Sequence, residues 1–149
     1  MTNVNVYDIR LVKEKGGRYN VEKYINKPED VQQYAINVLE LDERTEEVMG
    51  MLIVNAKNRV LGVFIVSIGS LSSSIVHPRE VFKRAIIKNA SGIVLFHNHP
   101  SGNPEPSRDD IEITKRIVDG GKILGISVFD HIIIGENNKY VSLKEKGEM

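Results

Sequence analysis

The 149-residue sequence contains no cysteine and no tryptophan, and its twenty basic residues are balanced by twenty acidic ones. Without cysteine the chain can form no disulfide and offers no thiolate to a metal ion, which excludes the cysteine-ligated zinc sites of nucleobase deaminases. The lack of cysteine is also typical of proteins in a reducing compartment. We therefore expect a cytoplasmic protein.

The zero net charge gives no support to DNA as a partner, because neutralising phosphates supplies most of the nonspecific affinity for DNA. A local basic patch at Lys83, Arg84 and Lys88 is the alternative. On a predicted helix, however, such residues are first interpreted as its solvated face.

Long apolar runs are missing as well. No stretch approaches the roughly 20 apolar residues of a membrane span, and residues 1–4 lack the pattern of a signal peptide. With 41% hydrophobic residues, a chain of this length is expected to bury about 68–70% of its unfolded surface in one core. We predict a single domain over residues 1–149 and no membrane partner.

The spacing of apolar residues predicts an α/β fold. Hairpins are mixed with single helical crossovers, which predicts a mixed sheet with helices on both faces. The predicted helices begin at Pro28, at Pro78 and after Ser107. The last of them is expected to bury Ile113, Ile117 and Leu124 and to end at Gly125. The predicted strands, in chain order, are 4–12, 18–25, 48–54, 59–68, 92–96, 126–134 and 140–141.

Two of the four histidines stand two residues apart at the end of an apolar run. The run from Gly92 to Phe96 is expected to be a buried strand, so His97 and His99 leave it on one face with their Cα atoms about 6.6 Å apart. Two imidazoles can close that gap around one ion with bonds of about 2.0–2.1 Å. The pattern predicts a metal site at the end of this strand.

The third ligand is expected from the start of the next helix. A proline-rich turn leads to Ser107, the predicted N-cap, and places Asp110 in the first helical turn. Two imidazoles, a carboxylate and one open position are typical of a catalytic zinc site. The alternative is that Ser107 and Asp110 only form a capping box. Two imidazoles at the end of an apolar strand need compensation for their burial, which favours the metal.

Hydrolysis at such a site also needs a carboxylate that takes a proton from the attacking water. The residues alone leave four glutamates open: Glu46, Glu47, Glu80 and Glu105. Glu80 is expected to pair with Arg84, four residues later on the same helix.

The remaining two histidines have structural interpretations. His77 precedes Pro78 and is expected at the entry to a helix. His131 lies in an apolar strand beside Asp130 and is by default a satisfied core histidine. The alternative is that His131 orients a metal ligand, because metal-bound imidazoles usually donate their second N–H to a partner.

The pattern His97-x-His99-Pro100, followed by Ser107 and Asp110, resembles the JAMM motif of MPN-type metallopeptidases. Longer strings resemble the RadC family, a bacterial branch of that superfamily, and the likeness runs from about residue 47 to 142. These strings are Val76 to Phe82, His97 to Gly102, Pro106-Ser107 and Asp130-His131. The resemblance implies the JAB/MPN fold, which has a cytidine-deaminase-like architecture.

The resemblance further implies a zinc-dependent hydrolase of amide or isopeptide bonds. JAMM enzymes carry their acid–base glutamate in a pattern like Glu-x-x-Gly-x-Leu, which the sequence starting at Glu47 fits; Glu46 is the second choice. By the same likeness His97, His99 and Asp110 are implied as ligands of Zn²⁺. Ser107 is implied as the hydrogen-bond donor to the developing oxyanion.

RadC proteins usually carry a helix-hairpin-helix domain ahead of this one, and the residues before 47 are too few to form it. Ubiquitin-binding insertions are not matched either, so neither DNA binding nor a ubiquitin substrate is implied. A DNA-metabolism binding protein with a non-essential metal site, or a metallonuclease, is the alternative. The first 40 residues are expected to cover a sheet edge or contact a partner; the substrate and the oligomeric state stay open.

Overall fold

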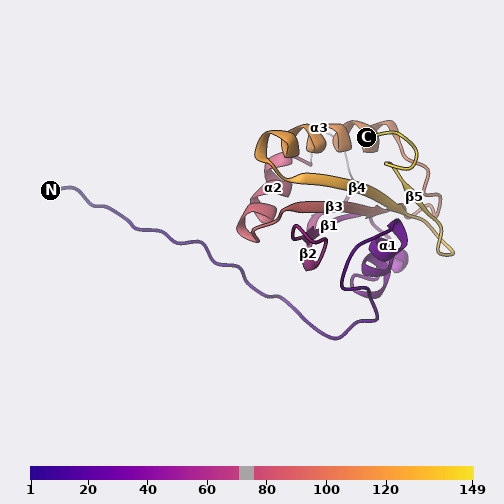
Figure 1. Cartoon of the computed structure of the whole chain (residues 1–149), viewed down its shortest axis with the longest axis horizontal. Helices are drawn as coiled ribbons and strands as arrows, with labels where there is room; N and C mark the ends of the chain where they lie inside the picture. Colours follow the sequence, from indigo (N-terminus) through magenta and orange to yellow (C-terminus); the bar gives the residue numbers. More distant parts are fainter. Residues whose placement is uncertain (71–75) are drawn as a thin grey trace.

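A computed structural model describes residues 1–70 and 76–149 (Figure 1). Its five strands form one sheet in the order β2-β1-β3-β4-β5. The strands are β1 (Val48–Val54), β2 (Val60–Ile68), β3 (Gly92–Asn98), β4 (Ser127–Ile134) and β5 (Tyr140–Ser142). β3 and β4 run parallel, whereas the other neighbouring pairs run antiparallel. The sheet is therefore mixed, as predicted, and β1 and β2 form the expected hairpin.

Helices cover both faces of this sheet (Figure 1). The helix α1 (Pro28–Asn37) packs on one face, and α2 (Pro78–Ile87) and α3 (Arg108–Leu124) pack on the other; a short 3-10 helix, η1 (Leu41–Glu43), follows α1. Alternate residues of β3 serve the two cores, since Ile93 and Leu95 join the cluster with α2 and α3 while Val94 and Phe96 join that with α1. The α/β fold with helices on both faces is confirmed.

The helices begin at the residues that the sequence marks. Pro28 and Pro78 lie in the first turns of α1 and α2, and Ser107 is the N-cap of α3. α3 ends at Gly125, whose φ of 69° is the left-handed conformation that glycine adopts readily. In the described ranges, no helix is long and apolar enough to cross a membrane.

Leu124 departs from the prediction that it packs beside Ile113 and Ile117. Both isoleucines are buried, but Leu124 is 48% exposed. The chain reverses at Gly125, directly after Leu124, and the next residue, Ile126, joins the core cluster instead. The prediction is wrong for Leu124 because the buried face of α3 ends before that residue.

Residues 1–23, all of them described, form no strand, so the strands predicted at 4–12 and 18–25 are wrong. Most of this segment leaves the body of the protein as an extended trace (Figure 1), whereas its end contacts α1, where the Tyr34 hydroxyl donates to the carbonyl of Glu22. Alternating apolar residues are not sufficient for a strand, because its N–H and C=O groups need a partner strand. Just beyond the segment, Tyr24 makes an isolated antiparallel bridge to Arg59, next to the start of β2.

Candidate metal centre

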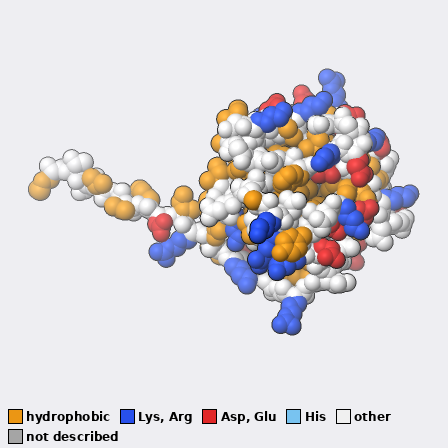
Figure 2. Space-filling model, viewed as in Figure 1, with side chains coloured by type: hydrophobic (Ala, Val, Ile, Leu, Met, Phe, Trp, Pro, Cys, Tyr) orange, Lys and Arg blue, Asp and Glu red, His pale blue; other side chains and the backbone are white. Residues whose placement is uncertain are grey.

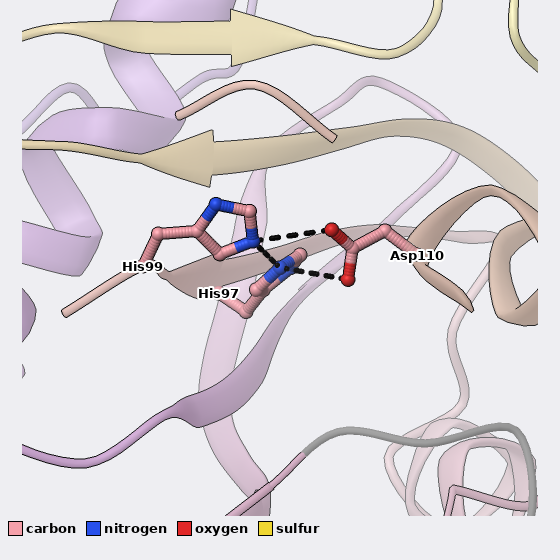
Figure 3. Close-up of side chains that lie close together, drawn as sticks. All are labelled: His97, His99 and Asp110. Atoms are coloured by element: carbon pink, nitrogen blue, oxygen red, sulfur yellow. Dashed lines mark hydrogen bonds and ion pairs between the residues drawn. The ribbon is translucent and has the colours of Figure 1, made fainter. Parts of the chain in front are cut away.

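His97, His99 and Asp110 come from two elements and face one another (Figure 3). His97 is the second-to-last residue of β3, His99 follows that strand, and Asp110 lies in the first turn of α3. The Nε2 atom of His97 lies 3.0 Å from His99 Nε2 and 3.2 Å from Asp110 Oδ1, and His99 Nε2 lies 3.1 Å from Asp110 Oδ2. The strand end and the helix start therefore meet as the sequence predicts.

These three side chains fit a single cation. A tetrahedral ion with bonds of about 2.0–2.1 Å holds its donor atoms about 3.4 Å apart, close to the separations of 3.0–3.2 Å found here. His99 Nδ1 lies 2.8 Å from the carbonyl oxygen of Asn103, which can only accept, so Nδ1 carries a proton and Nε2 is left to bind an ion. Two imidazoles and one carboxylate suit a divalent transition metal.

The charges in the cluster also favour a cation. A hydrogen bond with Asp110 raises the pKa of His99, and the negative charge of Glu47 adds to this effect. Burial by itself would raise the pKa of Asp110, but hydrogen bonds from His97 and His99 outweigh it and lower that pKa well below its usual range. Asp110 is thus a carboxylate at neutral pH, and its negative charge favours a cation beside the two imidazoles.

Asp110 also closes the N-terminal cap of α3. Its Oδ2 accepts a hydrogen bond of 2.8 Å from the backbone N–H of Ser107, and Ser107 Oγ accepts one of 3.1 Å from the N–H of Asp110. The capping box and the metal ligand are therefore compatible interpretations of one residue. The cap fixes the orientation of the carboxylate toward the two histidines.

The strand register separates Glu47 from Glu46. β1 and β3 pair antiparallel with Met49 opposite His97. Continued past the ends of both strands, this register would bring Glu47 to the level of His99. Opposite residues of an antiparallel pair share a face of the sheet, and neighbours along a strand alternate between faces. Glu47 is half-buried and influences His99 electrostatically, whereas Glu46 is exposed. The geometry thus favours Glu47 for chemistry at the histidines.

The other two candidate glutamates form ion pairs elsewhere. Glu80 binds Lys83 at 2.6 Å and Arg84 at 3.2 Å on α2, which confirms the predicted pairing with Arg84. Glu105 pairs with Lys146.

A further histidine contacts the cluster from β4. His131 Nε2 lies 2.7 Å from His97 Nδ1, and His131 Nδ1 lies 2.6 Å from Thr114 Oγ1. Burial lowers the pKa of His131 well below its usual value, and the charge of His97 lowers it further. His131 therefore fits the alternative interpretation, in which it orients a ligand. Thr114 was missed by the sequence analysis, and its only signal is its spacing of four from Asp110.

His77, by contrast, stays at the helix entry. It is the N-cap residue of α2 with extended backbone angles, and its side chain makes no capping hydrogen bond.

A model of the RadC-like JAB domain matches residues 25–148. The chain belongs to the RadC-like JAB domain family. The match confirms the resemblance seen in the motifs and begins earlier than residue 47, so that it includes α1.

Several curated proteins similar to this RadC-like JAB chain are named as UPF0758 proteins. One from Desulfitobacterium hafniense (strain DSM 10664 / DCB-2) is 50% identical over 127 residues, which are 85% of this chain and 55% of the relative. One from Caldanaerobacter subterraneus subsp. tengcongensis is 53% identical over 125 residues, 83% and 52% of the two chains. One from Bacillus cereus (strain AH187) is 53% identical over 141 residues, 94% and 60%. The chain thus spans about half the length of the curated relatives it matches.

A small cleft opens beside His99 of this RadC-like JAB domain. It has a volume of about 150 Å³, and His99, Arg44, Asp42 and Glu136 are among its lining residues. A larger cavity of about 450 Å³ is lined by residues of α1 and the sheet face beneath it. Of the three candidate ligands, only His99 lines the smaller cleft, and none of them lines the larger cavity.

Charges of both signs are mixed on the surface of the domain shown in Figure 2. Hydrophobic side chains recur along the extended N-terminal segment in the same view. Two of the three residues considered for a basic patch, Lys83 and Arg84, are bound to Glu80.

Proposed function

We propose that this protein is a zinc-dependent hydrolase that cleaves amide or isopeptide bonds. The observation that carries the proposal is the convergence of His97, His99 and Asp110. The half-buried Glu47 acts electrostatically on His99. Membership of the RadC-like JAB family supports the same chemistry. Two imidazoles and a carboxylate leave one coordination position for water or substrate, as in catalytic rather than structural zinc sites.

When bound, Zn²⁺ supplies a Lewis acid that polarises the substrate carbonyl and makes water a better nucleophile. The protein contributes the ligands and their fixed orientation. His99 is held by the Asn103 carbonyl, and Asp110 is held by the cap of α3. This arrangement is set before substrate arrives, so little reorganisation is needed during the reaction.

Glu47 is proposed as the acid–base residue. It takes a proton from the attacking water and passes it to the nitrogen of the scissile bond, which then leaves as a neutral amine. Its half-buried position beside His99 supports this role, since a group there can reach both the water and the leaving nitrogen.

Ser107 is proposed to stabilise the oxygen of the attacked carbonyl. Its Oγ accepts a hydrogen bond from the N–H of Asp110, which leaves the hydroxyl hydrogen to donate. The side chain is exposed and stands three residues from the ligand Asp110. A donor aimed at the carbonyl oxygen acts most strongly when negative charge develops in the transition state.

The test is hydrolysis of a peptide library that contains both α-amide and lysine isopeptide bonds, followed by mass spectrometry. Zinc-loaded wild-type protein and the control Glu46→Gln are expected to cleave the same peptides. Glu47→Gln is expected to lose about 10²–10⁴-fold in rate. Full turnover by Glu47→Gln would overturn the assignment of the base, and no cleavage of any peptide by the zinc-loaded wild type would overturn the proposed reaction.

A parallel incubation with supercoiled plasmid tests the nuclease alternative. We expect no nicking by the zinc-loaded protein. Nicking that disappears in His97→Ala would favour a metallonuclease over the hydrolase proposed here.

A further inference from the structure

We infer that Thr114 and His131 are positioning residues that set the tautomer of His97, so that its Nε2 lone pair faces the metal position. The inference rests on the metal site of the proposed function, but it does not depend on which bond that site cleaves. It follows from the direction of three hydrogen bonds that run from α3 through β4 to β3.

The fold brings these residues together on the sheet face that α3 covers. His131 pairs with Leu95 in the parallel β3–β4 ladder, and Thr114 lies one helical turn after Asp110. Thr114 and His97 are 0% exposed and His131 is 1% exposed, so water cannot substitute for any of their contacts. The donors and acceptors of these buried side chains therefore have to be satisfied by one another and by the neighbouring backbone.

The series of hydrogen bonds begins with the single hydrogen of the Thr114 hydroxyl. Thr114 Oγ1 lies 2.6 Å from the backbone oxygen of Asp110 and 2.6 Å from His131 Nδ1. A carbonyl oxygen can only accept, so the hydroxyl hydrogen points to Asp110. Thr114 therefore accepts at its other contact, and His131 carries its proton on Nδ1.

The tautomer of His131 then determines the tautomer of His97 through the hydrogen bond between the two rings. A neutral imidazole has one N–H, and that of His131 is used toward Thr114, so His131 Nε2 is an acceptor. It lies 2.7 Å from His97 Nδ1, which must then be the donor. When His97 is neutral, as a metal ligand must be, it consequently has a lone pair on Nε2, the atom that lies 3.2 Å from Asp110 Oδ1 and 3.0 Å from His99 Nε2.

The two ligand histidines thus obtain the same tautomer by different means. His99 donates its Nδ1 proton to the carbonyl of Asn103, a backbone group that can only accept. His97 donates to His131, a group that could act as donor or acceptor and needs Thr114 to fix its direction. Because Thr114 in turn donates to the backbone of Asp110, the pair links two of the three ligands. Partners of this kind contribute about 10–100-fold to metal affinity in known sites.

The first measurement needs no substitution. In metal-free wild-type protein, long-range ¹H–¹⁵N spectra of the imidazole rings report which nitrogen of each histidine is protonated. We expect His131 and His97 both to carry the proton on Nδ1. A proton on Nε2 of His97, with Nδ1 bare, would overturn the inference.

The second measurement compares Thr114→Val with Thr114→Ser in the full chain, by chelator competition for Zn²⁺. Valine has nearly the shape of threonine but cannot accept from His131, so both imidazoles are expected to switch to the Nε2–H tautomer and zinc affinity to fall about 10–100-fold. Serine keeps the hydroxyl and is expected to retain both the tautomers and the affinity. A purely structural role predicts lower stability for Thr114→Val with unchanged tautomers and zinc affinity, which would overturn the inference.

His131 provides an independent pair of variants. Glutamine can place its amide oxygen near the position of Nε2, so His131→Gln is expected to bind zinc more tightly than His131→Leu. Equal affinities for the two folded variants would count against the inference. Failure of the wild type to bind zinc would overturn the metal site itself, and the tautomers of the metal-free protein would still decide the role of Thr114 and His131.

Discussion

Asn98 holds the backbone on both sides of Glu47. Its Oδ1 accepts a hydrogen bond of 2.7 Å from Val48 N–H, and its Nδ2 donates one of 3.0 Å to the carbonyl of Glu46. Asn98 stands between His97 and His99 in the sequence but points to the opposite face of the sheet. The end of β3 therefore carries two ligands on one face and, with the residue between them, fixes the segment that carries the proposed base.

Removing this amide is expected to separate catalysis from metal binding. Asn98→Ala leaves the buried N–H of Val48 without its partner, which costs about 1–3 kcal/mol of stability. Turnover should fall further than stability explains, because Glu47 loses its support, while zinc affinity should change little. Urea unfolding, chelator competition and peptide hydrolysis measure the three effects. Asn37→Ala, at an exposed amide on α1, is the control; a tenfold loss of zinc affinity in Asn98→Ala would contradict this assignment.

Asp110 is expected to reveal its two roles through two substitutions. Asparagine can still accept from Ser107 N–H but has no charge, so Asp110→Asn should fold normally and lose most of its zinc affinity. Asp110→Ala also removes the acceptor of the Ser107 N–H, which is one of the two hydrogen bonds of the capping box, and should unfold about 1 kcal/mol more easily than wild type. Metal content and urea midpoints check both effects, with the exposed neighbour Asp109→Asn as control. If Asp110→Asn retained zinc at wild-type affinity, the carboxylate would not be a ligand.

The sequence predicts those parts of the site that depend on local order. The His97-x-His99 spacing and the Ser107 cap act within a few residues, so the strand end, the helix start and their side chains follow from periodicity and capping. The contact between His97 and His131 joins residues 34 positions apart and depends on the β3–β4 register, which contains an irregularity between Ile93 and Val94. No periodicity encodes such a register.

The wrong predictions have the same origin. Residues 4–12 alternate like a strand, yet a strand is stable only beside a partner, and the sequence does not say whether one is present. Leu124 continues the spacing of Ile113 and Ile117, yet the left-handed turn at Gly125 ends the helix there. Both errors arise because a local sequence pattern was used where tertiary contacts determine whether a strand forms or a residue is buried.

The adjacent glycines of α3 are expected to differ in their tolerance of alanine. A Cβ at Gly121 would lie 2.4 Å from the backbone oxygen of Ile126, which cannot move without shifting the start of β4. At Gly120 the nearest atom would be a side-chain atom of Phe82 at 3.0 Å. Gly121→Ala is therefore expected to lose about 1–3 kcal/mol through overpacking. Gly120→Ala should be near neutral, because the better helix propensity of alanine, about 0.5–1 kcal/mol, offsets the tight contact. Equal urea midpoints for the two variants would contradict this view of the helix–strand contact.

Tyr140 connects β5 to α1 through a hydrogen bond of 2.7 Å from its hydroxyl to Glu29 Oε1. Burial, followed by this hydrogen bond, raises the pKa of Tyr140 to about 12. The hydrogen bond with Tyr140 lowers the pKa of Glu29 in return. An ordinary tyrosine has a pKa of about 10, so the folded protein holds this proton more tightly than the unfolded chain does.

The contribution of Tyr140 to stability should therefore be complete below pH 10 and should fall as the pH rises toward 12, because the unfolded state loses its proton first. Tyr140→Phe is expected to remove this part of the pH dependence of the urea midpoint. Glu29→Gln should lower the pKa of Tyr140 only part of the way, since burial is the larger cause. Absorbance titration of the phenols measures that shift. Burial also raises the pKa of Tyr34, so Tyr34→Phe serves as the control that identifies which titration step belongs to Tyr140. A pKa of Tyr140 near 10 in the wild type would contradict both the burial of its hydroxyl and its hydrogen bond to Glu29.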